Sequence, residues 1–379
     1  MKQHAEGNFI TRDHPYVYLG GSLLALLALS LLASPAHPYS FLADGAFPTV
    51  LCTVICWTFL AISGLALMVK FAYWKTYSGT VLKRPWPVRV SRWLSYLVVL
   101  AVVLAVIDRG ILQLIYTVQV CLQAERNPQG FASSMIYMSL KGKDILLTGI
   151  WTTVRIALLG TGIAFLLAIL MVFLRIQEPD KRDNDFVKAV KWCANRFARL
   201  YVFVIRGTPM MVQALIFYYF GFNLFKRTGM TVTEINNVWS FFISGLCTVA
   251  LNSTAYLTEV LRGGIQAVDR GQTEAARSLG MSNWQTMMKV VFPQAVKNSI
   301  PAIGNEFIIN IKDSSVLSVI GVMDLMYATK SVSGIYFRSL EIYCVAALLY
   351  LVLTWLSSRL LTYLGSKLDT PYKGIPSSN

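Results

Sequence analysis

Polar and charged side chains interrupt an apolar run in the last third of the chain. Glu306, Asn310 and Asp313 share one helix face, because their separations each approximate one helical turn. Lys312 and Ser314 lie beside them in the sequence. A carboxylate facing lipid costs at least ~2.5 kcal/mol, so this face is expected to contact protein or an aqueous cavity. The pattern predicts either a binding site for a polar solute or a structural polar network, and both interpretations stay open.

Three other residues in apolar runs are candidates for contact with a solute. Asn252 and Tyr256 are spaced to share a helix face. Tyr256 either lines a solute pathway or belongs to an interfacial aromatic belt. Arg155 lies about two turns inside another run, where it either meets an anionic group of a solute or pairs within the protein.

Residues 269–293 form a polar, amphipathic stretch between two long apolar runs. Gly280 interrupts the helical pattern in the middle, and Pro293 is expected to end it. We therefore expect two short helices joined by a glycine elbow, lying outside the lipid and offering a face to a partner. The apolar residues that recur at helical spacing are Ala276, Leu279, Trp284, Met287, Met288, Val291 and Phe292.

Catalytic and metal-binding patterns are missing from the sequence. No Gly-x-x-x-x-Gly-Lys-Ser/Thr phosphate-binding loop occurs, so the chain is not expected to hydrolyse ATP. The 3 histidines all lie near the N-terminus. Of the 6 cysteines, Cys52 and Cys56 share a helix face, but no other ligands complete a metal site. We expect buried, apolar cysteines and no cofactor on this chain.

The composition indicates an integral membrane protein. The chain is 55% hydrophobic and 14% charged, whereas soluble domains contain about 25% charged residues. A spanning helix needs about 20 mostly apolar residues, and a lipid-exposed backbone must be helical. The expected fold is therefore all-α and polytopic. Eight spans are expected, at about 16–33, 49–73, 94–121, 146–174, 203–225, 239–261, 300–326 and 342–364.

The net charge of +15 is distributed as in a membrane protein rather than a nucleic-acid-binding protein. Lys and Arg cluster after the second, fourth, sixth and last runs, and such loops are typically cytoplasmic. This predicts cytoplasmic termini and a cytoplasmic loop at 263–299. The basic residues of loop 122–144 do not fit this pattern. Asp108 and Arg109 lie inside the third run and are expected to face protein or an interface. The first run is expected to be an uncleaved span rather than a secretory signal.

The 269–293 stretch resembles the EAA motif of ABC importer permeases. Glu274-Ala275-Ala276, Gly280 and Val290-Val291-Phe292-Pro293 occur at the family's spacing, with Val and Phe at the places of Ile and Leu. In that family the loop docks into a groove on a cytoplasmic ATPase, which binds the ATP and Mg. The resemblance therefore implies an ATPase-coupling role for Glu274, Ala275, Ala276, Gly280, Trp284 and Pro293.

Three further segments resemble the amino-acid importer branch of this family. They are Arg206-Gly207-Thr208-Pro209 followed by Gln213, Ala255–Glu259 followed by Arg262-Gly263, and Lys312–Leu317 preceded by Asn305. The resemblance covers residues 145–368, the expected permease core of five spans. Residues 1–144 form an extension with about three spans, similar to that of the large permease subunit of general L-amino-acid uptake systems. Residues 369–379 are expected to be a cytoplasmic tail.

The resemblance implies a multi-pass subunit of the bacterial inner membrane that moves L-amino acids into the cytoplasm. Its expected partners are ABC ATPase subunits, a paralogous or identical permease subunit and a periplasmic amino-acid-binding protein. An amino acid needs acceptors for its ammonium group, which Glu306 and Asp313 could supply. Its carboxylate needs donors, which Lys312 or an unwound backbone could supply. An ion-gradient-driven transporter using the same two carboxylates is the alternative.

Overall fold

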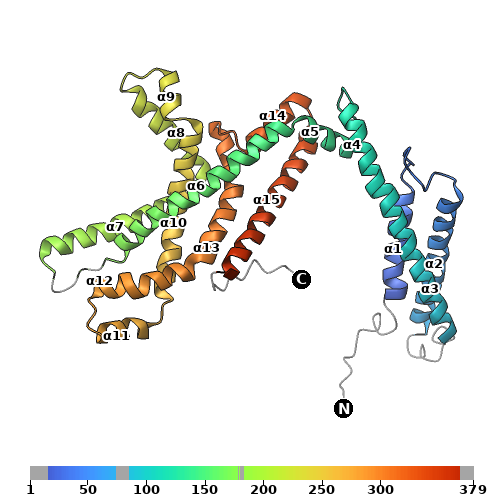
Figure 1. Ribbon diagram of the computed structural model, residues 1–379, viewed down its shortest axis with the longest axis horizontal. Coiled ribbons are helices and arrows are strands. Elements are labelled where there is room, and N and C mark those ends of the chain that lie inside the picture. Colours follow the sequence, from blue (N-terminus) through green and yellow to red (C-terminus); the bar gives the residue numbers. More distant parts are fainter. Residues whose placement is uncertain (1–15, 74–84, 178, 180–182, 368–379) are drawn as a thin grey trace, which may run out of the picture. The chain divides into compact units, whose positions relative to one another are not determined.

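The computed structural model describes residues 16–73, 85–177, 179 and 183–367 (Figure 1). Every regular element in these ranges is a helix, which confirms the all-α expectation. The predicted tail at 369–379 lies outside the described residues. The chain divides into two compact units, unit 1 at Met1–Tyr137 and unit 2 at Met138–Asn379.

Unit 1 packs its helices around small and apolar side chains. Its elements are η1 (Tyr16–Gly20), α1 (Gly21–Leu32), α2 (Phe47–Ala72), α3 (Pro85–Ala105), η4 (Val106–Leu112) and α4 (Gln113–Gln123), and α5 (Phe131–Lys141) runs across the boundary into unit 2. Ala28, Phe59 and Val98 are fully or almost fully buried between α1, α2 and α3. Cys52 and Cys56 belong to the same core, as expected for cysteines that act as small apolar residues.

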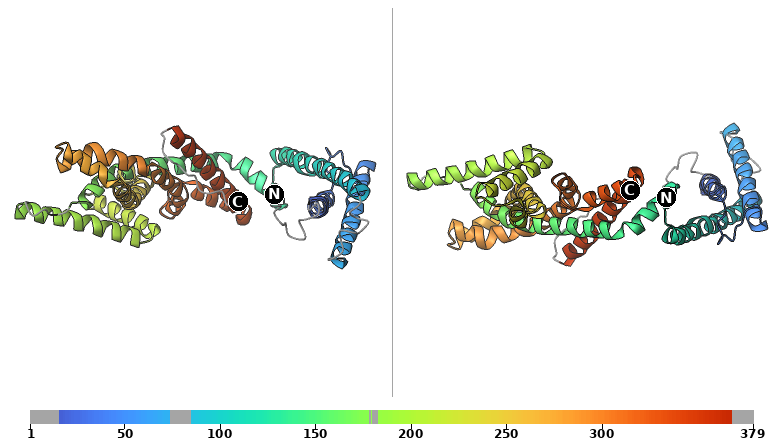
Figure 2. Two further views of the ribbon diagram at one scale, coloured as in Figure 1. Left: turned by 90° about the horizontal axis from the view of Figure 1, so that it is seen from below. Right: turned by 90° about the horizontal axis from the view of Figure 1, so that it is seen from above.

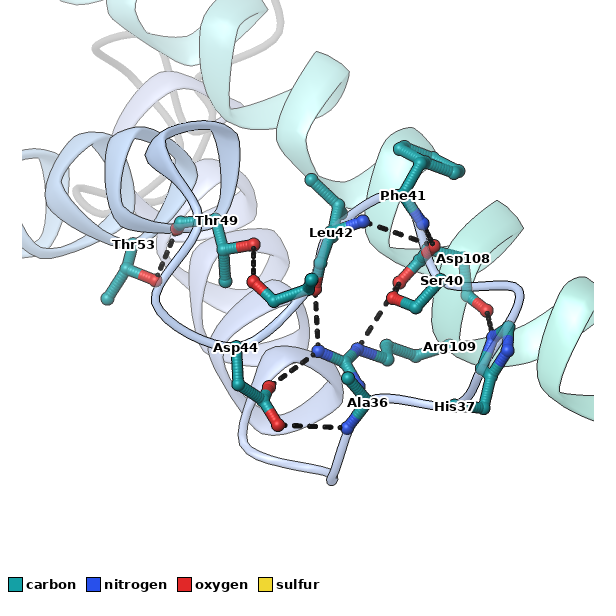
Figure 3. A network of polar contacts seen from close by, with 11 residues as sticks. Ala36, His37, Ser40, Phe41, Leu42, Asp44, Thr49, Thr53, Asp108 and Arg109 are labelled. Carbon is teal, nitrogen blue, oxygen red and sulfur yellow. Dashed lines mark hydrogen bonds and ion pairs between the residues drawn. The ribbon is translucent and has the colours of Figure 1, made fainter.

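The charged pair in the third run faces protein, as predicted. Asp108 is 0% and Arg109 6% exposed, in the widened π-helical turn η4 (Figure 3). The Asp108 carboxylate accepts hydrogen bonds from the Phe41 N–H at 2.8 Å and the Ser40 hydroxyl at 2.5 Å. Arg109 donates to the Leu42 carbonyl at 2.8 Å. The loop between α1 and α2 is therefore fixed to the middle of the third run.

Asp44 completes this network at the surface. Its carboxylate lies 2.9 Å from Nη2 of Arg109. Hydrogen bonds from the Ala36 N–H and from Arg109 hold the pKa of Asp44 below its ordinary value. Because the folded pKa is lowered, this contribution to stability is present at neutral pH. It is lost only as the pH falls through the folded pKa, in the acid range.

Unit 2 is built around α10, which packs against α6, α7, α8 and α13. Glycine allows two of its other helices to approach closely: a Cβ on Gly149 of α6 would lie 2.7 Å from the Cβ of Ala328 on α14. The elements of unit 2 after α5 are α6 (Lys143–Arg175), α7 (Asp185–Gly207), α8 (Met210–Lys226), α9 (Val232–Val238), α10 (Phe241–Gln266), α11 (Arg270–Ser278), α12 (Asn283–Thr286), η5 (Met287–Val291), α13 (Phe292–Asp313), η6 (Ser314–Ile320), α14 (Leu325–Tyr336) and α15 (Ser339–Lys367).

We predict that Gly149→Ala destabilises unit 2 by about 1–3 kcal/mol, because the new methyl group overpacks a rigid contact. It would also lie 2.9 Å from the Asp324 carbonyl oxygen and the Leu325 Cα, which are backbone atoms that cannot rotate away. Gly162→Ala on the same helix is the control, since its Cβ would meet nothing within 4 Å. Thermal unfolding of both purified variants checks this. Equal midpoints would contradict the close approach of α6 and α14.

The predicted count of eight spans is not confirmed. Five helices in the described residues are long and apolar enough to cross a membrane: Phe47–Val69, Arg89–Gln123, Lys143–Arg175, Phe241–Gln266 and Ser339–Ser366. The pair α7 and α8 passes the same test together but is bent by 112°, which gives up to six spans. The first expected span is represented by a shorter apolar helix, Tyr18–Leu32.

Two of the remaining expectations differ from the structure for identifiable reasons. The expected span 203–225 contains the break between α7 and α8, where Pro209 has no N–H for a continuous helix. The expected span 300–326 is not one helix, because α13 ends at Asp313 and a 3₁₀ helix follows. That segment ends at Gly321, whose φ of 95° is left-handed.

Candidate functional site

The 269–293 stretch contains a short helix, α11, and a glycine elbow, as predicted, but its second helix is not short. Asp269 caps α11, since its carboxylate accepts a hydrogen bond from the Gly271 N–H at 2.6 Å. The helix ends at Ser278, and Gly280 follows with a φ of 83°. Ser282 then caps α12 in a capping box with Gln285. Each turn of the elbow is therefore specified locally.

The prediction that Pro293 ends this stretch is wrong. Pro293 lies in the first turn of α13, and the chain stays helical from Asn283 to Asp313 through the widened turn η5. A proline in a first turn removes no needed N–H, so it starts α13 instead of stopping the segment. The candidate coupling segment is consequently continuous with a helix of the core.

The elbow presents apolar side chains outward. Leu279 is 83% and Trp284 60% exposed, and Glu274 and Ala275 are also exposed. Ala276 is buried on the inner side. The Trp284 ring touches the core at one edge, with its centroid 5.8 Å from that of Phe173 on α6. Exposed apolar residues at an otherwise polar elbow are typical of a surface that a partner covers.

A half-open pocket of about 540 Å³ lies between the end of α10 and the candidate coupling segment. Arg270 and Thr273 of α11 line one part of it, and Thr286 and Met287 line another. Ile265 near the end of α10 also lines it.

The polar stripe of α13 enters a buried hydrogen-bond network. Asn310 is 2% exposed and donates to the Thr161 hydroxyl of α6 at 2.8 Å. Its amide oxygen also accepts a hydrogen bond from the Ser253 hydroxyl of α10 at 3.0 Å. The Asn310 amide thus bridges three helices, which supports a structural role for this residue.

Asn252 belongs to a second network on α10. Its amide donates to the side-chain oxygen of Gln213 at 2.9 Å. Gln213 in turn donates to the Ile205 carbonyl at 2.7 Å and the Thr208 hydroxyl at 2.8 Å. These bonds satisfy the Ile205 carbonyl near the end of α7 and link α7, α8 and α10 beside the bend.

The other candidate residues of the α13 stripe differ in their exposure to solvent. Glu306 is 7% exposed and Ser314 is fully buried, whereas Lys312 and Asp313 are exposed. The predicted stripe is therefore divided between a buried part and an accessible part at the end of α13.

Tyr256 and Arg155 make contacts with residues outside this stripe. The Arg206 guanidinium lies 5.1 Å from the Tyr256 ring centroid. That of Arg155 lies 4.9 Å from the Phe242 ring. Arg155 thus has a partner within the protein, which was one of its two interpretations.

Comparison with known proteins shows which family this chain resembles. Residues 186–370 match the family model of the binding-protein-dependent transport system inner membrane component. The nopaline transport system permease protein of Agrobacterium fabrum is 32% identical over 219 residues, covering 57% of this chain and 84% of that protein. The glutamine transport system permease protein of Escherichia coli is 35% identical over 170 residues, covering 45% of this chain and 74% of that protein.

This chain belongs to the amino-acid ABC transporter permeases. A crystal structure of an amino acid ABC transporter with histidines matches 60% of the permease and 96% of that chain, with 34% identity and a TM-score of 0.50. Permeases of this family are multi-pass inner-membrane subunits, and hydrolysis of ATP belongs to a separate subunit. The family also implies a substrate-binding protein as partner. The matched family segment begins at residue 186, so it leaves unit 1 outside.

Proposed function

We propose that this permease moves L-amino acids into the cytoplasm and is driven through residues 269–293 by its ATPase partner. The observation that carries the proposal is the elbow at Gly280, which exposes Leu279 and Trp284 beside the exposed Glu274. An exposed apolar pair on a rigidly capped elbow supports docking into a partner's groove. Both termini and this segment would lie on the cytoplasmic side, where ATP is available.

The driving motion would be a rigid-body shift of this segment. Because α12, η5 and α13 form one helical path, a displacement of the elbow would reach α13 directly. The half-open pocket between α10 and the segment leaves room for that displacement. A second permease, identical or paralogous, would complete the pathway, and ATP with Mg would bind to the ATPase.

The accessible end of α13 is the proposed substrate-contacting region. Lys312 and Asp313 are exposed there and offer a cation and a carboxylate to the two charged groups of an amino acid. Directly after them the helix changes to the 3₁₀ form at Ser314, and such a change within a helix often marks a functional hinge. The buried Glu306 and the bridging Asn310 would support this region.

Uptake by reconstituted vesicles tests the proposed driving force. Purified permease with its ATPase and binding protein is expected to accumulate labelled amino acid only when ATP is present. An ionophore should leave that uptake unchanged. Uptake that continues without the ATPase and stops with the ionophore would contradict the proposal and favour the gradient-driven alternative.

We predict that Asp313→Asn raises the KM for amino-acid uptake about tenfold or more, because a hydrogen bond to a charged group contributes about 1.5–3 kcal/mol. Glu306→Gln, at a buried position, should change KM less. Asp185→Asn is the control, because its carboxylate is 98% exposed at the start of α7. An unchanged KM in Asp313→Asn for every amino acid tested would remove this carboxylate from the substrate pathway.

A further inference from the structure

A second, largely open pocket in unit 2, of about 470 Å³, lies outside the coupling segment and the substrate-contacting end of α13 proposed above. It lies where the end of α6, the C-terminal half of α7 and α10 meet, and we call it the arginine cavity. The lining residues that matter are Arg175, Arg199, Phe203, Arg206, Tyr256 and Glu259. Three guanidinium groups and one carboxylate thus face the same space.

The positive charge of the arginine cavity exceeds its negative charge. Glu259 is shared by two arginines, with Arg175 at 2.5 Å and Arg262 at 2.9 Å. Arg206 lies over the Tyr256 ring, and neither it nor Arg199 forms an ion pair with any described residue. These two guanidinium groups are left to attract an anion. Guanidinium groups bind phosphate oxygens in pairs, with well-matched geometry.

Exposed apolar side chains also lie on α7 beside the arginine cavity. Phe203 lines the cavity and is 76% exposed. Phe186, Phe197 and Val204 of α7 are also exposed and share a helix face, which lies about 100° around the helix from Phe203. The N-terminal half of α7 extends beyond the bundle of α8 and α10 in both views of Figure 2.

The orientation of α7 suits a position at the membrane surface. It is bent by 112° from α8, so the two cannot both stand upright in the lipid. A helix with an apolar face and a basic face typically lies in the headgroup region, with its apolar side in the acyl chains. The basic face of α7 includes Lys188, Arg196, Arg199 and Arg206.

We propose that the arginine cavity binds the phosphate headgroup of an anionic phospholipid. Arg199 and Arg206 would hold the phosphate, and the acyl chains would pass Phe203 toward the exposed apolar face of α7. These apolar side chains favour a lipid over a soluble anion, which gains nothing from them. This inference does not depend on the direction of transport or on the identity of the substrate.

Binding of defined lipids to the purified permease–ATPase complex tests the proposal. The measured quantities are bound phosphatidylglycerol, counted by native mass spectrometry, and the rise of the unfolding temperature on titration. Phosphatidylcholine and glycerol phosphate are titrated in parallel. We expect tighter binding of phosphatidylglycerol than of either, and about tenfold weaker binding in the double variant Arg199→Gln/Arg206→Gln.

Two matched variants control for charge and folding. Lys226→Gln/Arg227→Gln removes the same charge at the end of α8, outside both the cavity and α7, and should keep the wild-type affinity. Arg199→Lys/Arg206→Lys keeps the charge but loses the paired guanidinium geometry, so an intermediate affinity is expected. Wild-type affinity in the Arg199→Gln/Arg206→Gln variant would overturn the proposal. So would glycerol phosphate or phosphatidylcholine binding as tightly as phosphatidylglycerol.

Discussion

Replacing Gly280 with valine is expected to weaken binding of the ATPase about tenfold or more while the permease still inserts and folds. The φ of 83° at this position is left-handed, and a β-branched residue there costs about 1–3 kcal/mol. No atom lies within 4 Å of a Cβ at this site, so the effect comes from the backbone and not from a clash. The elbow would open, and Leu279 and Trp284 would leave their docking positions.

Two variants separate this effect from a general loss of stability. Gly280→Asn should bind the ATPase nearly as well as the wild type, because asparagine tolerates the left-handed conformation. Gly263→Ala, in α10 with nothing within 4 Å of the added Cβ, should also bind normally. The measurement is the affinity of purified permease variants for the ATPase. Wild-type affinity in Gly280→Val would show that the elbow geometry is not needed for coupling.

Arg109→Met is expected to destabilise unit 1 by about 3–5 kcal/mol, because it leaves a buried carboxylate without its cation. Asp108 is 0% exposed, and Arg109 Nε lies 3.3 Å from its carboxylate. The same change removes the hydrogen bond to the Leu42 carbonyl that holds the loop between α1 and α2. We therefore expect a lower unfolding temperature and faster proteolysis between residues 34 and 46.

Arg92→Met provides the control for this change. Arg92 lies on α3 of the same run but is exposed, so its loss should change stability by at most about 0.5 kcal/mol. Equal proteolysis rates in the two variants would mean that the Asp108–Arg109 network does not fix the loop.

Features that depend on local chemistry could be predicted from the sequence. Gly280 marked the elbow because glycine adopts a left-handed turn more readily than any other residue. The cost of a charge in lipid indicated that Asp108 and Arg109 must face protein or lie near an interface. The partner of Arg109 could not be predicted, because Asp44 lies 65 positions away and is brought close only by packing. Pro293 misled because proline can start a helix as well as end one.

The burial of the candidate substrate residues could not be predicted from the sequence. Periodicity placed Glu306, Asn310 and Asp313 on one face, but it could not show that Asn310 is buried while Asp313 is exposed. The partners of Asn310 are small polar residues, Ser253 and Thr161, 57 and 149 positions away. Serine and threonine are common in apolar helices, so neither carries a signal by itself. The contacts of Gln213 with α7 and α10 beside the 112° bend likewise could not be predicted from the sequence.

The side of the membrane that residue 283 faces tests the central claim most directly. Asn283→Cys places a thiol on the exposed start of α12, in a Cys193→Ser background that removes an exposed native cysteine. Val232→Cys is the reference for the other side of the membrane. Val232 is 60% exposed, and its helix α9 lies at the end of unit 2 opposite to α11 and α12 in Figure 1. We predict that a membrane-impermeant maleimide labels Asn283→Cys only from the cytoplasm and Val232→Cys only from outside. Labelling of Asn283→Cys from outside the cell would contradict coupling to a cytoplasmic ATPase.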